Sequence, residues 1–149
     1  MKNSDVKIRK ATIKDVGTLL KIGNSTEEFE VDKEGNTFWD KEPLLQWIKS
    51  NKDVILIAEM NNDIIGFVMF AHHVPTGKVT WENAWINPKY RGQNIINMLY
   101  NQAEKELKAK GAKYVCGMTK PTSKASIRMQ EKLGFEQGLK FIWMGKFLK

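Results

Sequence analysis

The sequence contains little cysteine and no long apolar run. Its 149 residues include one cysteine, Cys116, which excludes an intrachain disulfide and offers no ligand spacing for a zinc site. No apolar stretch approaches the roughly 20 residues that a membrane-spanning helix needs. The first ten residues, MKNSDVKIRK, lack the apolar core of a secretory signal peptide. These absences favour a cytoplasmic protein that contacts no membrane and holds no metal ion.

The composition indicates one folded domain over residues 1–149. Hydrophobic residues make up 42% of the chain and charged residues 28%, which is typical of a globular protein. The net charge of +7 is open to two interpretations. It attracts an anionic partner, or it serves solubility alone, an interpretation that rests on the scatter of the lysines along the chain. The chain has no readable basic helix or aromatic ladder, which argues against nucleic acid as that partner.

Apolar periodicity predicts alternating strands and helices. Period-two alternation and short apolar runs bounded by turn residues predict strands, whereas apolar residues three and four apart predict helices. The predicted strands span Val6–Arg9, Val54–Met60, Ile64–His73, Lys78–Ile86, Lys113–Met118 and Leu139–Leu148, and the predicted helices contain Val16–Gly23, Phe38–Ile48 and Ile95–Lys110.

The stretch from Trp81 to Lys110 predicts a strand, a basic glycine-containing loop and a long helix that stops at Gly111. A loop that leads into a helix N-terminus offers unpaired backbone N–H groups and the positive end of the helix dipole, both of which favour a phosphate. Arg91 adds a fixed positive charge to this loop. On the strand, alternation places Glu82, Ala84 and Ile86 on one face, and Trp81, Asn83 and Trp85 on the other.

The loop carries a family resemblance. Its sequence, INPKYRGQNII, resembles the acyl-CoA-binding signature of the GCN5-related N-acetyltransferases, the GNAT family. Two positions depart from the family pattern, which has Gly at the first and Gly or Ala at the second. The matching residues are Pro88, Tyr90, Arg91, Gly92 and Ile95, and the departures are Asn94 and Ile96.

A second stretch, Thr119–Phe135, resembles the family's short helix that ends in Gly-Phe, here Gly134-Phe135. By this resemblance Ser123 stands where the family has an Asn that contacts the pantetheine arm, although an N-cap role also explains Ser123. Gln130 stands where the family often has a Tyr that protonates the leaving thiolate. Gln cannot donate an acidic proton, so water would have to serve.

The resemblance implies a single α+β domain with the three-layer GNAT fold. It implies a mixed, mostly antiparallel twisted sheet of six to seven strands with about four helices. The implied activity is acetyl-CoA-dependent N-acetyl transfer to a primary amine of a small molecule or peptide, by direct attack in a ternary complex. The alternative is a catalytically weak or inactive member of the fold that binds a ligand or partner, and a homodimer is left open.

The resemblance also implies the site. The carbonyl of the thioester would meet a backbone N–H of the strand that ends at Ile86, and coenzyme A would lie between that strand and the one that starts at Lys113. Glu82 is the candidate base; it lies four residues before Ile86, about 13 Å at strand rise, so contact would need water. A salt-bridged surface role for Glu82 is equally open. The implied coenzyme-binding residues are Ala84, Ile86, Arg91, Gly92, Gln93, Asn94, Ile95, Ile96 and Ser123.

Two further features are open to alternative interpretations. His72 and His73 are adjacent and point to opposite faces of a strand, which argues against a metal site, although one of them could serve as a base or line the acceptor pocket. An acidic segment is interpreted as a solvated loop or, alternatively, as the rim of an acceptor site that attracts a cationic amine. Its carboxylates are Glu27, Glu28, Glu30, Asp32 and Glu34.

Overall fold

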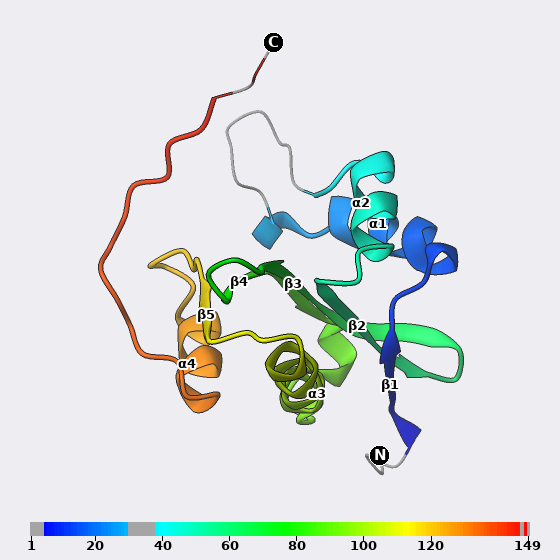
Figure 1. Cartoon of the computed structure of the whole chain (residues 1–149). Coiled ribbons are helices and arrows are strands. Elements are labelled where there is room, and N and C mark those ends of the chain that lie inside the picture. The colour runs from blue at the N-terminus through cyan, green and yellow to red at the C-terminus, as the bar shows by residue number, and fades with distance from the viewer. Residues whose placement is uncertain (1–4, 30–37, 147, 149) are drawn as a thin grey trace. The chain divides into compact units, whose positions relative to one another are not determined.

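The computed structural model describes residues 5–29, 38–146 and 148 (Figure 1). The chain forms two compact units, Met1–Met118 and Thr119–Lys149. That these units make one domain stays a prediction. Three carboxylates of the acidic segment, Glu30, Asp32 and Glu34, lie outside the described residues, so its predicted role is not addressed at these positions.

The first unit contains a five-stranded mixed sheet with the strand order β1-β2-β3-β4-β5. The first four strands pair antiparallel, and β5 pairs parallel to β4. This confirms the predicted mixed, mostly antiparallel sheet, although the described residues form five strands and not six or seven. The strands are β1 (Lys7–Lys10), β2 (Val54–Met60), β3 (Asp63–His73), β4 (Lys78–Ile86) and β5 (Tyr114–Gly117).

The β2–β3 hairpin forms where the sequence predicts it. Asn61 and Asn62 connect the strands with positive φ angles of 52° and 65°. A two-residue hairpin turn needs such angles, and Asn tolerates them better than most residues. Val54 to Ala58 are buried, so β2 lies in the interior of the unit and carries no alternating polar face.

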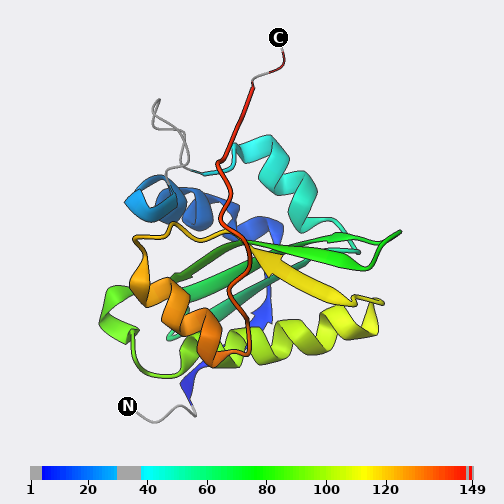
Figure 2. The ribbon, with the colours of Figure 1, turned by 90° about the vertical axis from the view of Figure 1, so that its left-hand side faces the viewer.

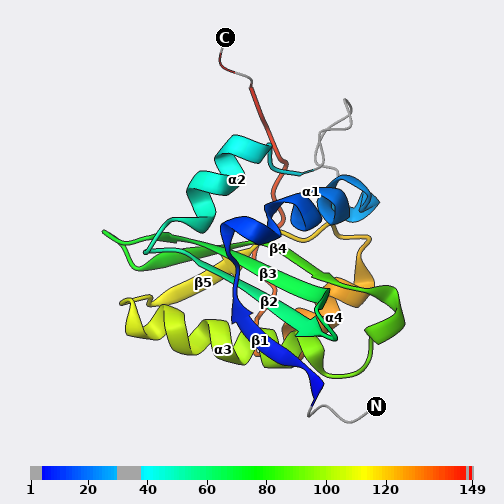
Figure 3. The ribbon, with the colours of Figure 1, turned by 90° about the vertical axis from the view of Figure 1, so that its right-hand side faces the viewer.

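Helices cover both faces of this sheet, which gives the predicted three layers (Figure 3). On one face, side chains of the first two helices pack on Ile57, Phe67 and Met69 of the sheet. On the other face runs α3, the long helix seen along its length in Figure 2. The helices of this unit are α1 (Val16–Asn24), α2 (Lys41–Ile48) and α3 (Ile95–Ala109), with short 3-10 turns η2 (Ile13–Asp15), η3 (Glu27–Phe29) and η4 (Pro88–Tyr90).

The long helix stops where predicted. Gly111 has φ of +85°, a left-handed conformation that costs little without a Cβ. Its N–H donates to the Lys108 carbonyl, and the N–H of Ala112 donates to the Leu107 carbonyl. These two bonds satisfy carbonyls that the helix end would leave free, as in a Schellman motif.

A charged network ties the first strand to its surroundings. The guanidinium of Arg9 contacts both carboxylate oxygens of Asp15 at 2.8 Å and donates to Glu59 of β2 at 2.7 Å. Asp15 also accepts from the backbone N–H of Thr12 at 2.7 Å. The hydrogen bonds from Arg9 are the main cause that lowers the pKa of Asp15, although burial of this carboxyl opposes them.

The second unit contains α4 (Lys124–Lys132), followed by Gly134 as predicted. The predicted closing strand over Leu139–Leu148 is wrong for the residues described there, because 139–146 and 148 have no regular structure. An apolar stretch becomes a strand only with a hydrogen-bonding partner, which composition does not reveal.

No helix within the described part of the chain is long and apolar enough to cross a lipid bilayer.

Candidate functional site

The predicted site lies on the second half of β4. This strand pairs with β3 along its whole length, but its pairing with β5 ends at Trp81 and Gly117. Beyond this point β4 continues for five residues, 82–86, without pairing to β5. One side of this segment is therefore open within the first unit.

Backbone groups of Ala84 and Ile86 face this open side. The N–H of Asn87 donates to the Ile65 carbonyl of β3 at 2.9 Å. Antiparallel partners alternate between pairs that exchange hydrogen bonds and pairs that do not. Trp85 lies two residues before Asn87, so its backbone N–H and C=O groups also face β3. The backbone N–H and C=O groups of Ala84 and Ile86 therefore point to the opposite, open side. The two strand residues predicted from the resemblance are thus those whose backbone N–H groups point to this side and pair with no described strand of the first unit.

The strand is irregular at Glu82. Phe70 pairs with Trp81, but Met69 pairs with Asn83, so Glu82 is an extra residue in β4. The predicted shared face of Trp81, Asn83 and Trp85 is therefore wrong, because an inserted residue reverses the alternation. Trp81 lies on the α3 face, where it stacks on Phe70 at 5.2 Å, while Asn83 and Trp85 lie on the face of α1 and α2.

Glu82 lies half-buried at this bulge. Burial raises the pKa of its carboxyl, and no charged group contributes to the shift. No side chain in the described ranges forms an ion pair with it. The salt-bridged alternative thus finds no support there, and the raised pKa brings this carboxylate closer to the neutral range in which a general base works best.

The loop after β4 is built from local hydrogen bonds. The side chain of Asn87 accepts from the backbone N–H of Lys89 at 3.1 Å and starts the turn η4. Gly92 has φ of +76°, and a Cβ there would meet nothing within 4 Å. Asn94 has φ of +64°, so it adopts the left-handed conformation at the position where the family pattern has Gly. This conformation agrees with the tolerance of Asn for positive φ.

Arg91 binds back onto the strand. Its Nε donates to the Ile86 carbonyl at 3.2 Å, which ties the loop to the open side of β4. No described residue binds its two Nη groups, so these groups can donate to an anion, since a guanidinium has five N–H groups. Gln93 donates from its side chain to the Lys89 carbonyl at 3.3 Å, so its amide helps to hold the loop.

The start of α3 leaves backbone donors uncapped. Asn94 occupies the N-cap position, but its side chain accepts from the side chain of Asn97 and caps no backbone N–H. The first backbone bond of the helix runs from Met98 to the Asn94 carbonyl at 3.2 Å. The N–H groups of Ile95, Ile96 and Asn97 therefore point out of the helix start, where the dipole favours a negative charge.

The two isoleucines at this helix start differ in burial. Ile95 is 1% exposed and anchors the first turn in the core, whereas Ile96 is half-buried. The loop and helix start thus bring Arg91 to Ile96 together beside the end of β4. Their role in coenzyme binding stays a prediction.

Other predicted site residues lie elsewhere. Ser123 occupies the N-cap position of α4 in the second unit and makes no capping hydrogen bond there. Gln130 of the same unit donates to the Thr119 hydroxyl at 2.5 Å. Because these belong to the second unit, the contact of Ser123 with a pantetheine arm stays a prediction.

The histidines do not join the candidate site. His72 is 2% exposed, so a substrate does not reach it, and both its ring nitrogens lack a hydrogen-bond partner among the described residues. His73 is exposed, and its Nδ1 lies 2.8 Å from the Thr76 hydroxyl in the turn before β4. No three His, Cys, Asp or Glu side chains of the described ranges gather as a metal ion would require.

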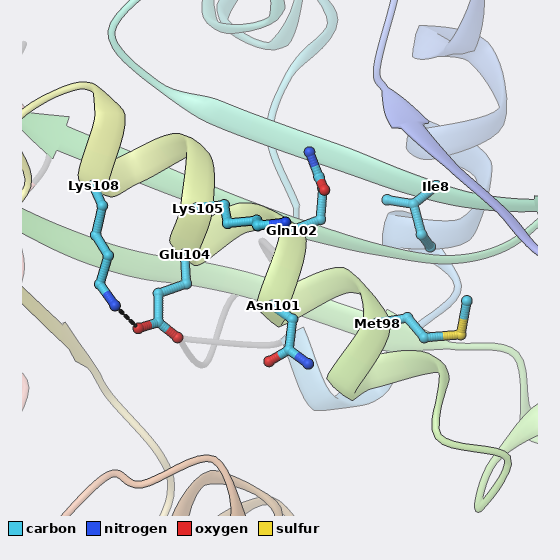
Figure 4. A pocket seen from close by; sticks show the side chains of 7 residues that line it. All are labelled: Ile8, Met98, Asn101, Gln102, Glu104, Lys105 and Lys108. Atoms are coloured by element: carbon cyan, nitrogen blue, oxygen red, sulfur yellow. Dashed lines mark hydrogen bonds and ion pairs between the residues drawn. The ribbon is translucent and has the colours of Figure 1, made fainter.

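A groove of about 490 Å³ lies between β1 and the outer surface of α3 (Figure 4). Its lining includes no residue of β4, of the loop after β4 or of the uncapped start of α3, residues 95–97. The groove therefore does not belong to the candidate site. Its lining consists of Ile8, Met98, Asn101, Gln102, Glu104, Lys105 and Lys108.

Sequence reasoning missed one contact of the site. The indole Nε1 of Trp39, just before α2, donates to the side-chain oxygen of Asn83 at 2.8 Å. The two residues are 44 positions apart, so no local pattern signals their contact. The unusual density of tryptophan, five in 149 residues, was the only available sign.

Comparison with known proteins identifies the family. The model of the acetyltransferase (GNAT) family matches residues 23–135. An acetyltransferase of Pectobacterium atrosepticum is 31% identical over 111 residues, which cover 67% of this chain and 77% of the relative. An acetyltransferase of Sodalis glossinidius is 28% identical over 75% of this chain and 85% of its own length. The chain belongs to the GNAT family and is an N-acetyltransferase.

Solved structures share the fold. AAC(6')-Iy in complex with the bisubstrate analogue CoA-S-monomethyl-acetylneamine has a TM-score of 0.75 at 19% identity, over 96% of this chain and 99% of the other. The PaiA N-acetyltransferase of Thermoplasma acidophilum in complex with coenzyme A has a TM-score of 0.74 at 22% identity, over 88% and 89%. At these identities the likeness establishes the fold alone and confirms the predicted fold class.

Proposed function

We propose that this N-acetyltransferase takes its acetyl group from acetyl-CoA and transfers it to a primary amine of a small molecule or peptide. The observation that carries the proposal is the open side of β4, where backbone groups of Ala84 and Ile86 lie next to the uncapped start of α3. The two related folds solved with coenzyme A or a coenzyme A conjugate support this choice of acyl donor.

The loop and helix start fit the phosphates of the coenzyme. The N–H groups of Ile95, Ile96 and Asn97 and the free Nη groups of Arg91 are donors of the kind that bind phosphate oxygens. Gly92 leaves open space where a side chain would begin, so the backbone there can be approached closely. Gln93 and Asn94 hold the loop conformation through their own bonds.

Glu82 and the strand backbone supply the chemistry of transfer. Acetyl-CoA brings the acetyl group as a thioester. Through a water molecule, Glu82 accepts the proton that the amine loses, and the amine nitrogen then forms a bond to the acetyl carbon. A backbone N–H of Ala84 or Ile86 donates to the carbonyl oxygen as its negative charge grows. The carbon–sulfur bond breaks, the nitrogen gives up its second proton to water, and water delivers a proton to the leaving thiolate.

Calorimetric titration with acetyl-CoA tests the phosphate cradle. We expect Arg91→Ala to weaken binding by about tenfold, because it removes a charge-assisted pair of donors. Lys14→Ala is the matched control, since it removes one exposed positive charge far from the loop in sequence. Equal affinities of wild type and Arg91→Ala would refute the cradle.

A further inference from the structure

Next to the open segment of β4 lies a set of aromatic side chains that the transfer chemistry does not use. We call Trp39, Trp47 and Trp85 the indole cluster. Trp39 and Trp47 meet edge to face at 4.9 Å. Trp85 stacks on Phe67 at 5.9 Å and lies on the same face of β4 as Asn83, the partner of Trp39. The indole cluster thus adjoins the strand residue that follows Glu82.

Trp39 presents ring surface to solvent. It is 38% exposed, the largest exposed fraction in the indole cluster. Its single donor, the indole N–H, is already used by Asn83. What Trp39 still offers to a ligand is therefore the π-bearing carbon surface of its ring. The bond to Asn83 also fixes the ring, so a ligand would not have to order it.

Such a surface suits a cation. An ammonium group over an indole ring is attracted by the ring quadrupole, and Trp is the best of the aromatic side chains for this contact. Asp40 and Glu42 follow Trp39 in sequence and are exposed, and Glu27 and Glu28 are exposed on η3. In a chain with net charge +7 these carboxylates would lessen the repulsion of a positively charged ligand.

We infer that the amine acceptor carries a second positive charge, as in a diamine or polyamine, and that this charge packs against Trp39. The inference rests on the proposed function and names the substrate class of the same site. The amine to be acetylated loses a proton toward Glu82, whereas the second ammonium stays charged and takes no part in bond changes. Trp39 is then a specificity residue, and Asn83 is a positioning residue that holds its ring.

Two probe amines separate charge from size. (2-Aminoethyl)trimethylammonium and 3,3-dimethylbutylamine have nearly the same shape, and only the first carries a fixed charge. The ratio of their kcat/KM values is compared between variants, so the different basicity of the two probes cancels. We expect Trp39→Leu to lower this ratio by about threefold to tenfold, and Trp39→Phe to lower it less.

Further variants separate recognition from general packing. Asn83→Leu should also lower the ratio, and adding it to Trp39→Leu should have no further effect, because the two act through one ring. Tyr114→Leu is the control, since Tyr114 is an exposed aromatic residue at 63% and pairs with Lys78 at the far end of β4. Its ratio should match that of wild type.

The outcomes distinguish the two proposals. An unchanged ratio in Trp39→Leu would overturn the inference while leaving acetyl transfer in place. If wild type acetylates no amine, the proposed function fails, and the indole N–H resonances decide whether Trp39 binds a fixed positive charge. A shift of the Trp39 resonance with the trimethylammonium probe but not with its neutral isostere upholds this contact, and no selective shift overturns it.

Discussion

At the residue scale, the burial of Glu82 affects both its proposed role as a base and the stability of the folded protein. Burial raises the pKa of its carboxyl, and the bulge in β4 separates it from the regular ladder. The same burial makes the ionised form costly in the folded state. A role as catalytic base would explain why a carboxyl occupies this half-buried position at the end of the β4–β5 pairing, where its charge is destabilising.

Replacing Glu82 with Gln should lower kcat/KM for acetyl transfer by about a hundredfold near neutral pH, because a positioned general base is lost. The pH dependence supplies the sharper readout. In wild type, kcat/KM should fall on the acidic side as Glu82 becomes protonated, and this limb should be absent from the variant. An acidic limb that persists in Glu82→Gln would assign the base to another group.

The same substitution should stabilise the protein at neutral pH. A carboxyl whose folded pKa is raised contributes stability that is present below its unfolded pKa and lost as pH rises through the folded pKa. Wild type and Glu82→Gln should therefore melt alike at low pH, and the variant should melt higher at neutral pH. Thermal unfolding across pH measures this, and a variant that melts lower at neutral pH would contradict it.

At the scale of elements, Asp15 joins β1, η2 and β2 through Arg9. Asp15→Asn should cost about 2 to 3 kcal/mol at neutral pH, because it leaves a partly buried guanidinium with a weaker partner. Since the pKa of Asp15 is lowered in the folded state, its contribution is present above the unfolded pKa and lost as pH falls through the folded one.

Urea unfolding at several pH values checks this contribution. Glu28→Gln is the control, because Glu28 is exposed and makes no ion pair with the described residues. A cost for Asp15→Asn that stays constant down to the most acidic pH would contradict the role of ionised Asp15.

Gly66 of β3 tests the packing beneath the candidate site. A Cβ at Gly66 would lie 2.6 Å from the Ile86 Cδ1 atom and 3.1 Å from the Trp85 carbonyl oxygen. Gly66→Ala should cost about 1 to 3 kcal/mol through overpacking. Adding Ile86→Val, which removes that Cδ1, should recover part of the cost. Gly17→Ala is the matched control, since nothing lies within 4 Å there, and equal effects at both glycines would contradict the close approach.

The elements also show what the sequence could and could not predict. The turn at Asn61 and Asn62 and the end of α3 at Gly111 have local chemical signatures, so both were predictable. The bulge at Glu82 has none, because the strand sequence KVTWENAWI does not alternate clearly enough for a one-residue shift of phase to be recognised. The prediction for Trp81 failed for this reason, and its indole N–H in fact donates to the Asn83 carbonyl at 3.1 Å.

At the scale of the whole molecule, the family motif predicted the loop and helix start, because those residues are contiguous in sequence. Contacts between distant segments were not predictable: the bond from Trp39 to Asn83 spans 44 residues. The last apolar stretch was wrongly predicted as a strand, since its residues have the right composition but pair with no described strand. Local chemistry thus predicted elements and the hairpin between neighbouring strands, whereas contacts between distant segments were not predictable.

The most direct test of the proposed function measures free thiol released from acetyl-CoA as a function of added amine. We predict that release by wild type requires both protein and a diamine, with one equivalent of acetylated amine detected by mass spectrometry for each thiol. Thiol release that no amine accelerates, despite bound acetyl-CoA, would contradict acetyl transfer to an amine and would favour a ligand-binding member of the fold.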